Sequence, residues 1–553
     1  MKFTEAKLEN AFIELLSKEN IPHVPGHAID RSDDDVLIKQ DLKDYLLAAY
    51  KKENLTETEA NYIIDELEKL PSSDLFETNK KIMKKLADGF NLKREDRSKK
   101  DLRIYLIDYT SKNKNVYKMV NQLTIVEHHP QGRIPDGIIY INGLPLVVIE
   151  FKTAIETNAT TFNAYEQLTR RYKKDIPSLF KYNAFCILSD GVNNRAGSFF
   201  APYEFYYAWR RTEGMPNEVD GMKTLNTMIQ GMLNQKRLRD IIHNFIFVPD
   251  VSKREVKILC RYPQYYASRK LFENIKKSQK PGGDGKGGTY FGATGSGKSF
   301  AMLFLSRLLM KSTHFKSPTI VLITDRNDLD DQLATEFTNA KGFIGDQNIA
   351  SVTSRNDLKE KLSGRNSGGV FLTTIQKFAE DTDLLTDRNN VICISDEAHR
   401  TQINLDQKIK VSNKVVKKSY GFAKYLHDAL PNATYVGFTG TPVDATLDVF
   451  GGVIDAYTMQ DSVEDKITVK IIYEGRAAKV LLNNKKLKEI EAYYAQCLEQ
   501  GANEYQIEES KKATTQMNAI IGDPDRLLAV ANDFINHYET RVAEGATVKG
   551  KAM

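Results

Sequence analysis

The sequence predicts an α/β protein with two differently built halves, and three patterns support this prediction. Residues 1–125 read as mostly helical, because amphipathic runs such as FIELLSKE and ANYIIDELEKL alternate with polar stretches. Strand-like apolar runs follow, namely DGIIYI, LPLVVIEFK and NAFCILSDG (183–191). Beyond residue 288, short β-branched runs alternate with helical segments, which is typical of a parallel sheet with helices on both faces.

The elements of the second half follow in a regular order. A helical stretch around 222–243 precedes KKSQKPGGDGKGG (276–288), whose lysine and glycine density predicts a flexible, exposed loop. The predicted strands are TYFGAT (289–294), TIVLITD (319–325), GVFLTT (369–374), VICISDE (391–397) and ATYVGFTGT (433–441).

From about residue 476 the pattern turns helical again, with KKLKEIEAYYAQCLEQ and DPDRLLAVANDFINHYETRV. In the second run Asp523 is the expected N-cap and Pro524 the first helical residue. We therefore expect three parts, at residues 1–250, 251–475 and 476–553.

Composition excludes few functional classes. The 553 residues carry 78 basic and 73 acidic side chains, and this balance neither requires nor excludes nucleic acid. Two basic clusters, RRYKK (170–174) and six lysines between Lys408 and Lys424, read as solvated faces when taken alone. The four widely spaced cysteines argue against a zinc site and fit a reducing cytosol, with Cys186 and Cys393 expected in the core.

No membrane attachment is expected. The N-terminal run reads as an amphipathic helix with acidic residues and not as a signal peptide. No apolar run reaches the roughly 18 residues that a membrane span needs.

The stretch GATGSGKS (292–299) matches the phosphate-binding pattern G-x-x-x-x-G-K-S, with a strand before it and a helix after it. Its glycines let backbone N–H groups surround phosphates, Lys298 reaches the terminal phosphates, and Ser299 holds Mg²⁺. The candidate nucleotide-binding residues are Gly292, Ala293, Thr294, Gly295, Ser296, Gly297, Lys298 and Ser299. The alternative, a chance glycine-rich turn, is disfavoured by a second motif.

That second motif is SDEAH (395–399), at the end of the apolar run VICI. A buried parallel strand brings such acids to the ligand-binding edge of a sheet. Asp396 is predicted to bind Mg²⁺ through water, and Glu397 to orient or deprotonate the attacking water. The alternative is a plain surface pair of acids.

The first half contains a second candidate site, in PDGIIYINGLPLVVIEFK (135–152). Asn142-Gly143 is a strong turn signal between two apolar runs, so the stretch reads as a β-hairpin. Glu150 and Lys152 share one side of their strand, and Asp136 comes from the partner strand. Two carboxylates can bind a divalent cation, and a nearby lysine can offset phosphate charge. Together they are the groups needed to hydrolyse a phosphodiester. The alternative is a solvent-facing acid pair at the strand ends.

The hairpin poses a problem of parity. With a regular two-residue loop, Asp136 would pair with residue 149 and not with Glu150, and a one-residue slip reverses every side chain. If both acids bind one cation, the hairpin must contain one extra residue that sets Asp136 opposite Glu150. We predict either a three-residue loop with a glycine bulge or a β-bulge near Pro135 or Pro145.

The motifs of the second half, GATGSGKS, DEAH (396–399) and TGTP (439–442), resemble in that order the first RecA-like lobe of a superfamily-two helicase or translocase. TDRNDLDDQ (324–332) and TTIQKF (373–378) resemble further motifs of such lobes. The resemblance implies ATP as substrate and Mg²⁺ as its partner. It also implies that Gln264 reads adenine, unless it is a plain surface glutamine. His399, Thr439, Gly440 and Thr441 would couple hydrolysis to DNA contact.

The hairpin motif, P-D followed by E-x-K, resembles the PD-(D/E)XK nuclease family, whose fold is restriction-endonuclease-like. Related nucleases carry a Q-x-x-x-Y pair on a helix beside the metal site. Here Gln167 and Tyr172 are five positions apart, so a plain basic surface helix is an equal alternative.

Together, the two halves resemble the restriction (R) subunit of type I restriction-modification enzymes, including SDG (189–191) and YEGR (473–476). The resemblance implies ATP-driven translocation of duplex DNA and Mg²⁺-dependent cleavage of unmethylated DNA. It also implies methyltransferase (M) and specificity (S) subunits as partners, in the cytoplasm of a bacterium or archaeon.

The chain departs from the family because no motif of a second RecA-like lobe or of a C-terminal docking domain follows residue 476. We therefore expect a truncated product, a split gene or an incomplete sequence with weak ATP turnover. The alternatives are a stand-alone ATP-dependent nuclease–helicase of repair or phage defence, and a DNA-binding fragment without catalysis.

Overall fold

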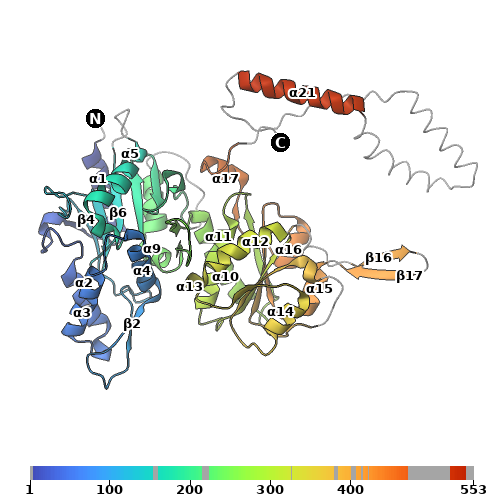
Figure 1. Cartoon of the computed structure of the whole chain (residues 1–553), viewed down its shortest axis with the longest axis horizontal. Coiled ribbons are helices and arrows are strands. Elements are labelled where there is room, and N and C mark those ends of the chain that lie inside the picture. The colour runs from blue at the N-terminus through green and yellow to red at the C-terminus, as the bar shows by residue number, and fades with distance from the viewer. Residues whose placement is uncertain are drawn as a thin grey trace, which may run out of the picture. The chain divides into compact units, whose positions relative to one another are not determined.

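The computed structural model describes residues 4–152, 160–213, 223–325, 327–378, 384–399, 407–412, 415–420, 422–470 and 524–543. The chain divides into two compact units, Met1–Val469 and Lys470–Met553. The first unit contains two large β-sheets, and helices pack on both (Figure 1). The expected α/β class is confirmed.

The N-terminal sheet is six-stranded and mixed, in the order β1-β4-β5-β6-β7-β8. The β1/β4 and β6/β7 pairs are parallel and the other three are antiparallel. Its strands are β1 (His23–Pro25), β4 (Tyr117–Asn121), β5 (Gly137–Ile141), β6 (Leu144–Phe151), β7 (Phe185–Ser189) and β8 (Asn194–Gly197). Every residue of β5 and β6 is buried, so this hairpin forms the centre of the N-terminal core.

Helices precede and follow the central hairpin. They are α1 (Glu5–Lys18), α2 (Lys39–Ala49), α3 (Glu57–Glu68), α4 (Leu75–Asp88), α5 (Thr161–Glu166), α6 (Lys173–Asp175), α7 (Pro177–Phe180), α8 (Lys223–Met228) and α9 (Gln235–Asn244). The prediction of a mostly helical stretch over 1–125 is partly wrong. β1 and β4 belong to the main sheet, and β2 (Phe90–Leu92) pairs with β3 (Leu102–Ile104). Strands of three to five residues are too short to show a period, and distant partners stabilise them.

The second sheet is seven-stranded and parallel throughout, in the order β13-β14-β12-β15-β18-β11-β19. Its strands are β11 (Lys286–Gly292), β12 (Thr319–Thr324), β13 (Ile349–Ser351), β14 (Val370–Thr374), β15 (Val391–Ser395), β18 (Thr434–Thr439) and β19 (Val453–Tyr457). All five predicted strands are present. The two that the sequence missed, β13 and β19, are edge strands with exposed positions and a weak apolar pattern.

Helices cover both faces of this parallel sheet. They are α10 (Tyr262–Ser278), α11 (Lys298–Lys311), α12 (Asn327–Thr338), α13 (Lys341–Ile344), α14 (Arg355–Leu362), α15 (Phe422–Ala429), α16 (Asp444–Phe450) and α17 (Met459–Glu464). Along β12, Ile320 and Leu322 join one apolar core while Val321 and Ile323 join the other. Side chains alternate along a strand, so both faces are buried, as the continuous apolar runs predicted.

The predicted loop over 276–288 is wrong at both ends. Helix α10 continues to Ser278 and β11 begins at Lys286, which leaves residues 279–285 as the connection. Gly288 is buried, and a Cβ there would lie 2.2 Å from Ile454 Cγ1. The glycines therefore serve close strand packing as well as flexibility, and composition alone does not separate these roles.

The remaining predictions of local structure fall into three groups. Cys186 and Cys393 are buried in β7 and β15, as expected. In the second unit, α21 (Pro524–Ala543) begins at Pro524, as predicted. The run KKLKEIEAYYAQCLEQ, the YEGR stretch and Asp523 lie outside the described residues.

Two small antiparallel pairs complete the described strands. The first is β9 (Ile246–Phe247) with β10 (Ile258–Leu259). The second is β16 (Gln407–Ser412) with β17 (Val415–Tyr420), within the lysine cluster between β15 and α15. Among the described helices, none is long and apolar enough to cross a bilayer.

Candidate functional sites

The β5–β6 hairpin solves its parity problem with a bulge. Its turn residues Asn142 and Gly143 have positive φ angles of 51° and 75°, as a two-residue hairpin turn requires. Tyr140 pairs with Pro145, but Ile139 pairs with Val147, so one residue of β6 is left over beside Pro145. The predicted bulge near Pro145 is confirmed.

The bulge changes which residues face one another at the open end of the hairpin. Gly137 pairs with Ile149, and the next step of this register sets Asp136 opposite Glu150. Asp136 Oδ2 accepts a hydrogen bond of 2.7 Å from the backbone N–H of Phe151. The two acids therefore lie on one side of the sheet, next to Lys152.

The three side chains form a buried, charged cluster. Glu150 is fully buried, and its Oε1 accepts a hydrogen bond of 3.0 Å from Lys152 Nζ. Its second oxygen, Oε2, is buried and has no hydrogen-bond partner among the described residues. An unpartnered buried carboxylate oxygen is costly, and a bound cation would satisfy it. The residues present therefore fit a divalent metal ion.

Electrostatics lead to the same conclusion. Burial raises the pKa of Asp136 to about 6, which the Phe151 N–H and Lys152 partly oppose. Burial and the neighbouring Asp136 charge raise the pKa of Glu150 to about 8. Two acids in this position resist ionising together, and a divalent cation between them would favour the charged forms.

In the part of the chain that the structure describes, Asp136 and Glu150 are the two carboxylates that the hairpin itself brings together. Among the described residues, no group of three or more His, Cys, Asp or Glu side chains has the arrangement of a complete metal site. A cation held by Asp136 and Glu150 would complete its shell with water or with substrate oxygens.

Gln167 and Tyr172 meet in spite of their irregular spacing. Helix α5 continues into a π-helical segment, η3 (Gln167–Tyr172), whose hydrogen bonds join residues five apart. Gln167 Nε2 donates to Tyr172 Oη over 2.9 Å, and that hydroxyl donates to the carbonyl of Ile134 over 3.1 Å. The wider helical turn thus compensates for the extra residue in Q-x-x-x-x-Y.

Tyr172 is buried near Asp136 and Glu150 and does not lie on the surface. It is 2% exposed, and burial followed by the Glu150 charge raises the pKa of its hydroxyl. The alternative of a plain surface helix is therefore wrong for this residue. The four basic residues around it, Arg170, Arg171, Lys173 and Lys174, are exposed as that alternative expected.

Sequence reasoning missed two further acids near this site. The charges of Glu5 and Glu9, on α1, contribute to raising the pKa of Asp136. Glu9 also accepts a hydrogen bond from the side chain of Asn121 on β4. A spacing of four in an N-terminal helix sets two acids on one face, and this was the available signal.

The nucleotide motif forms the loop between β11 and α11. Gly295 and Gly297 have φ angles of 77° and 81°, and a Cβ on Gly297 would lie 2.7 Å from Gln264 Nε2. Lys298 Nζ lies 3.3 Å from the carbonyl oxygen of Gly292 and 3.5 Å from Glu397 Oε1. The lysine thus joins the loop to the acid that follows β15.

The acids of DEAH lie at the carboxyl end of β15. The backbone N–H of Asp396 donates to the carbonyl of Ile323 over 2.8 Å, and burial raises the pKa of its side chain. Glu397 has a φ of 46°, an uncommon angle for a residue other than glycine. Its Oε2 lies 3.5 Å from His399 Nδ1, while its Oε1 faces Lys298.

The four residues of the expected coupling set lie together. His399 Nδ1 and Thr439 Oγ1 are 2.7 Å apart, and the N–H of Thr441 donates to the same hydroxyl over 3.1 Å. A Cβ on Gly440 would lie 3.2 Å from Thr294 Oγ1 and 3.7 Å from Lys298 Nζ. The TGTP segment therefore lies directly against the nucleotide loop.

Gln264 lies beside the loop and is not a surface glutamine. It is 4% exposed, and its Nε2 donates to the carbonyl of Gly297 over 3.1 Å. The sequence missed its neighbour Arg261, whose guanidinium donates to the carbonyl of Ser296 and lies over the ring of Tyr207. Its position three residues before Gln264, one helical turn away, was the available signal.

The two softer motifs also meet at this edge of the sheet. TDRNDLDDQ covers the end of β12 and the start of α12, and TTIQKF covers the end of β14 and a 3₁₀ turn over Ile375–Phe378. Gln376 Nε2 donates to the carbonyl of Asp325 over 2.8 Å. Parallel strands end together, which brings these distant segments into contact.

Comparison with known families matches both halves of the chain. Residues 2–205 match the model described as "Type I restriction enzyme R protein N terminus", and residues 263–506 match "SWI2/SNF2 ATPase". Among solved structures, bacteriophage T4 UvsW is similar at 15% identity over 40% of this chain and 38% of that chain, with a TM-score of only 0.26.

Two relatives extend the match along most of the chain. The type I restriction enzyme HindI endonuclease subunit of Haemophilus influenzae is 34% identical over 90% of this chain and 47% of its own length. The putative type I restriction enzyme MjaIXP endonuclease subunit of Methanocaldococcus jannaschii is 29% identical over 93% of this chain and 49% of its own. The chain thus spans about half the length of these relatives. Both matched regions, and the identity along nine tenths of the sequence, show that the chain belongs to the family of type I restriction enzyme endonuclease (R) subunits.

Proposed function

We propose that this protein cleaves unmethylated duplex DNA at the β5–β6 hairpin and moves DNA with ATP at the parallel sheet. The observation that carries the nuclease assignment is the bulged hairpin. It sets Asp136 opposite Glu150, with Lys152 bonded to one Glu150 oxygen and the other left unpartnered. Family membership and the arrangement around the nucleotide loop support the ATP-driven step.

At the nuclease site, Asp136 and Glu150 would hold Mg²⁺, which polarises the scissile phosphodiester and activates a water when bound. Lys152, 16% exposed, would offset the charge that develops on the phosphate. The hydrogen bond between Gln167 and Tyr172, and that from Tyr172 to the carbonyl of Ile134, would fix the backbone just before Asp136.

At the ATP site, the loop from Gly292 to Ser299 would surround the phosphates. Lys298 would exchange its contacts with Gly292 and Glu397 for the terminal phosphates. Ser299 and Asp396 would hold the Mg²⁺ that accompanies ATP, and Glu397 would orient the attacking water. Gln264 would contact the adenine from its position beside Gly297.

The DEAH and TGTP motifs would couple ATP hydrolysis to contact with DNA. His399 faces Glu397 on one side and Thr439 on the other. The N–H of Thr441 donates to the Thr439 hydroxyl, and Gly440 lies against Thr294 of the nucleotide loop. A change at the γ-phosphate would therefore move the TGTP segment.

The partners follow from the family. We propose duplex DNA as substrate, and methyltransferase and specificity subunits as partners that recognise the site, in the cytoplasm of a bacterium or archaeon. We also propose residues 1–250 as the nuclease domain, 251–475 as the first motor lobe and 476–553 as a connector. The separate sheets, over residues 23–197 and 286–457, support the first two ranges.

The test is cleavage of unmethylated plasmid, with and without ATP, by the chain extended to the full length of its relatives and mixed with a methyltransferase–specificity complex. Cutting should require ATP and the complex, and Lys298→Ala and Asp136→Ala should each abolish it. Asp136→Ala should retain ATP binding, and methylated plasmid should stay intact. Cutting that needs no partner would favour a stand-alone nuclease–helicase. Cutting that survives Asp136→Ala would place the nuclease site elsewhere.

A further inference from the structure

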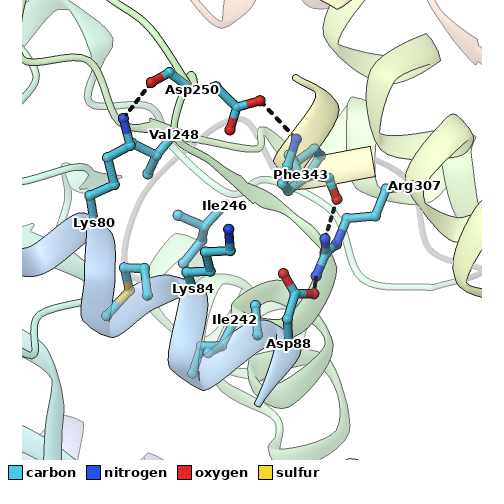
Figure 2. Close-up of a pocket in the computed structure, with 12 residues that line it drawn as sticks. Lys80, Lys84, Asp88, Ile242, Ile246, Val248, Asp250, Arg307 and Phe343 are labelled. Atoms are coloured by element: carbon cyan, nitrogen blue, oxygen red, sulfur yellow. Dashed lines mark hydrogen bonds and ion pairs between the residues drawn. The ribbon is translucent and has the colours of Figure 1, made fainter. Parts of the chain in front are cut away.

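Several ion pairs join the two halves of the first unit, among them Arg211–Asp455 and Arg210–Asp465, and the arginine of a further pair is the most buried. Arg307, on α11, is 1% exposed, and its Nη2 lies 3.0 Å from Asp88 Oδ1 at the end of α4 (Figure 2). Its guanidinium also donates to the carbonyl of His243 over 2.7 Å and to the carbonyl of Phe343. One side chain thus joins α4 and α9 to α11 and α13.

Asp88 is unusual for its position in α4. A negative charge in the last turn opposes the helix dipole, so this acid is unfavourable for α4 itself. Burial raises the pKa of the Asp88 carboxyl. The positive charges of Arg307 and Lys311 outweigh burial, so the net pKa of Asp88 is lowered. Lys311 Nζ lies 3.0 Å from the same oxygen. Asp88 is therefore held in its charged form by two cations of α11.

On the ATP side, the pair is connected to the nucleotide loop by one helix. Helix α11 begins at Lys298, and Arg307 follows nine residues later, about 13 Å along the axis at 1.5 Å per residue. The helix is continuous and most of the residues between them are buried, so α11 can transmit a displacement as one element. Any shift of its first turn reaches Arg307.

On the nuclease side, α4 is bonded to the segment that precedes β7, the strand beside Glu150. Nδ2 of its buried Asn79 lies 2.8–3.1 Å from the carbonyl oxygens of Phe180, Lys181 and Asn183, among which its two N–H groups are shared. The buried ammonium of Lys257 fastens this contact by donating to Asn79 Oδ1 and to the carbonyl of Asn183. These residues lead directly into β7, in which Leu188 pairs with Glu150.

The junction also contains free space. A small pocket of about 60 Å³ lies beside the ion pair, lined by apolar side chains such as Ile242, Ile246 and Phe343 and by the charged side chains of Lys80, Lys84 and Asp250. Tight packing would hold α4 and α11 in one arrangement, whereas this space allows a small displacement of one against the other.

We propose that Asp88 and Arg307 form a positioning contact through which the nucleotide loop and the nuclease hairpin affect one another. The proposal rests on the proposed function. Nucleotide binding must displace Lys298 from Gly292 and Glu397, which moves the start of α11. The ion pair passes that shift to α4, and Asn79 passes it to β7 and β6.

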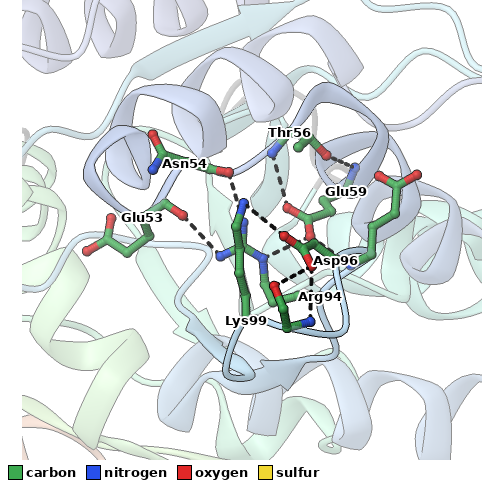
Figure 3. A network of polar contacts seen from close by, with 9 residues as sticks. Glu53, Asn54, Thr56, Glu59, Arg94, Asp96 and Lys99 are labelled. Atoms are coloured by element: carbon green, nitrogen blue, oxygen red, sulfur yellow. Dashed lines mark hydrogen bonds and ion pairs between the residues drawn. The ribbon is translucent and has the colours of Figure 1, made fainter.

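The first half contains a matched pair that does not join the two regions. Glu59 and Arg94 are also buried, with Arg94 Nε 2.8 Å from Glu59 Oε1 (Figure 3). Arg94 also donates to the carbonyls of Glu53 and Asn54. The pair fastens the β2–β3 hairpin to α3, so its loss removes a buried charge contact without touching α11.

The experiment measures amide hydrogen exchange with and without a non-hydrolysable ATP analogue. In the native protein, the analogue should change exchange at the loop over 292–299. It should also change exchange over 144–151 and 180–189, by roughly fivefold or more, as coupled sites typically require. In Asp88→Asn the change at the loop should remain while the change at the two nuclease segments disappears.

Two variants separate positioning from stability. Asp88→Glu keeps the charge and should retain the distant response, and Glu59→Gln should retain it as well. If Asp88→Asn does not fold, Lys311→Gln removes one of the two cations and should reduce the response. A distant response that persists in Asp88→Asn or is unchanged in Lys311→Gln, or that is absent from the native protein, overturns the proposal. Absence of any change at 292–299 would instead contradict the ATP site itself.

Discussion

The two sheets position their functional side chains in different ways. In the parallel sheet, the nucleotide loop, DEAH and TGTP come from three strands that end at one edge, so regular topology brings them together. In the mixed sheet, the acids come from one hairpin, and two irregularities bring them into place. These are the bulge beside Pro145 and the π-helical turn over Gln167–Tyr172. The comparison teaches that regular topology is enough to bring the parallel-sheet motifs together, whereas the hairpin site depends on two local irregularities.

The largest expected effect breaks the nuclease side alone. Asp136→Asn keeps the shape of the side chain but removes one of the two charges opposite Glu150. We expect cation affinity and DNA cleavage to fall by more than about 100-fold, since even outer-shell changes cost metal sites 10- to 100-fold. Mn²⁺ titration and plasmid cleavage measure this, with binding of an ATP analogue as the control. Retained Mn²⁺ affinity would show that the hairpin does not hold the cation.

The second prediction concerns pH. The pKa of Glu150 is raised from 4.5 to about 8, so the folded protein binds a proton that the unfolded chain has released. The free energy of unfolding without metal should therefore fall as pH rises from about 5 to 8, by about 3 kcal/mol from Glu150 alone. Denaturant unfolding at several pH values measures this. Glu150→Gln should remove most of the slope and Mn²⁺ should flatten it, while a slope unchanged in Glu150→Gln would refute this origin.

The third prediction breaks the motor side alone. Gly297→Ala forces a Cβ into a position with a φ of 81° and 2.7 Å from Gln264 Nε2. The strain costs about 1–3 kcal/mol, so affinity for an ATP analogue should drop roughly 5- to 100-fold. Fluorescence titration measures the affinity, and Mn²⁺ binding at the hairpin should be unchanged. Gly282→Ala, where a Cβ meets its first atom only at 3.9 Å, is the matched control and should bind as the native protein does.

The smallest expected effect sharpens the role of the π-helical turn. Tyr172→Phe removes the hydrogen bonds to Gln167 and to the carbonyl of Ile134. The loss should cost about 1 kcal/mol of unfolding free energy and lower cleavage without abolishing cation binding. Thermal unfolding and cleavage rates measure the two effects. Cation binding that disappears in Tyr172→Phe would mean that the hydroxyl, and not the acids alone, holds the metal.

The sequence predicted the parallel sheet better than the mixed one for a physical reason. Strands buried on both faces leave long apolar runs such as VICIS, and all five such runs form strands. A short strand such as β1 leaves no such record, because it is stabilised by a partner strand about 100 residues away. The same limit hid Arg261 and the acids of α1, whose positions beside the two sites depend on packing.

By itself, the sequence determined which residues are candidates for chemistry: an apolar hairpin with two acids and a lysine, and the glycine-rich run GATGSGKS followed by DEAH and TGTP. Motif spacing reflects local backbone geometry, which neighbouring residues decide. Only the tertiary structure decided that a bulge restores the parity of Asp136 and Glu150, and that a π-helical turn joins Gln167 to Tyr172. It alone also decided that Asp88 meets Arg307, since contacts between residues 219 positions apart depend on how whole elements pack.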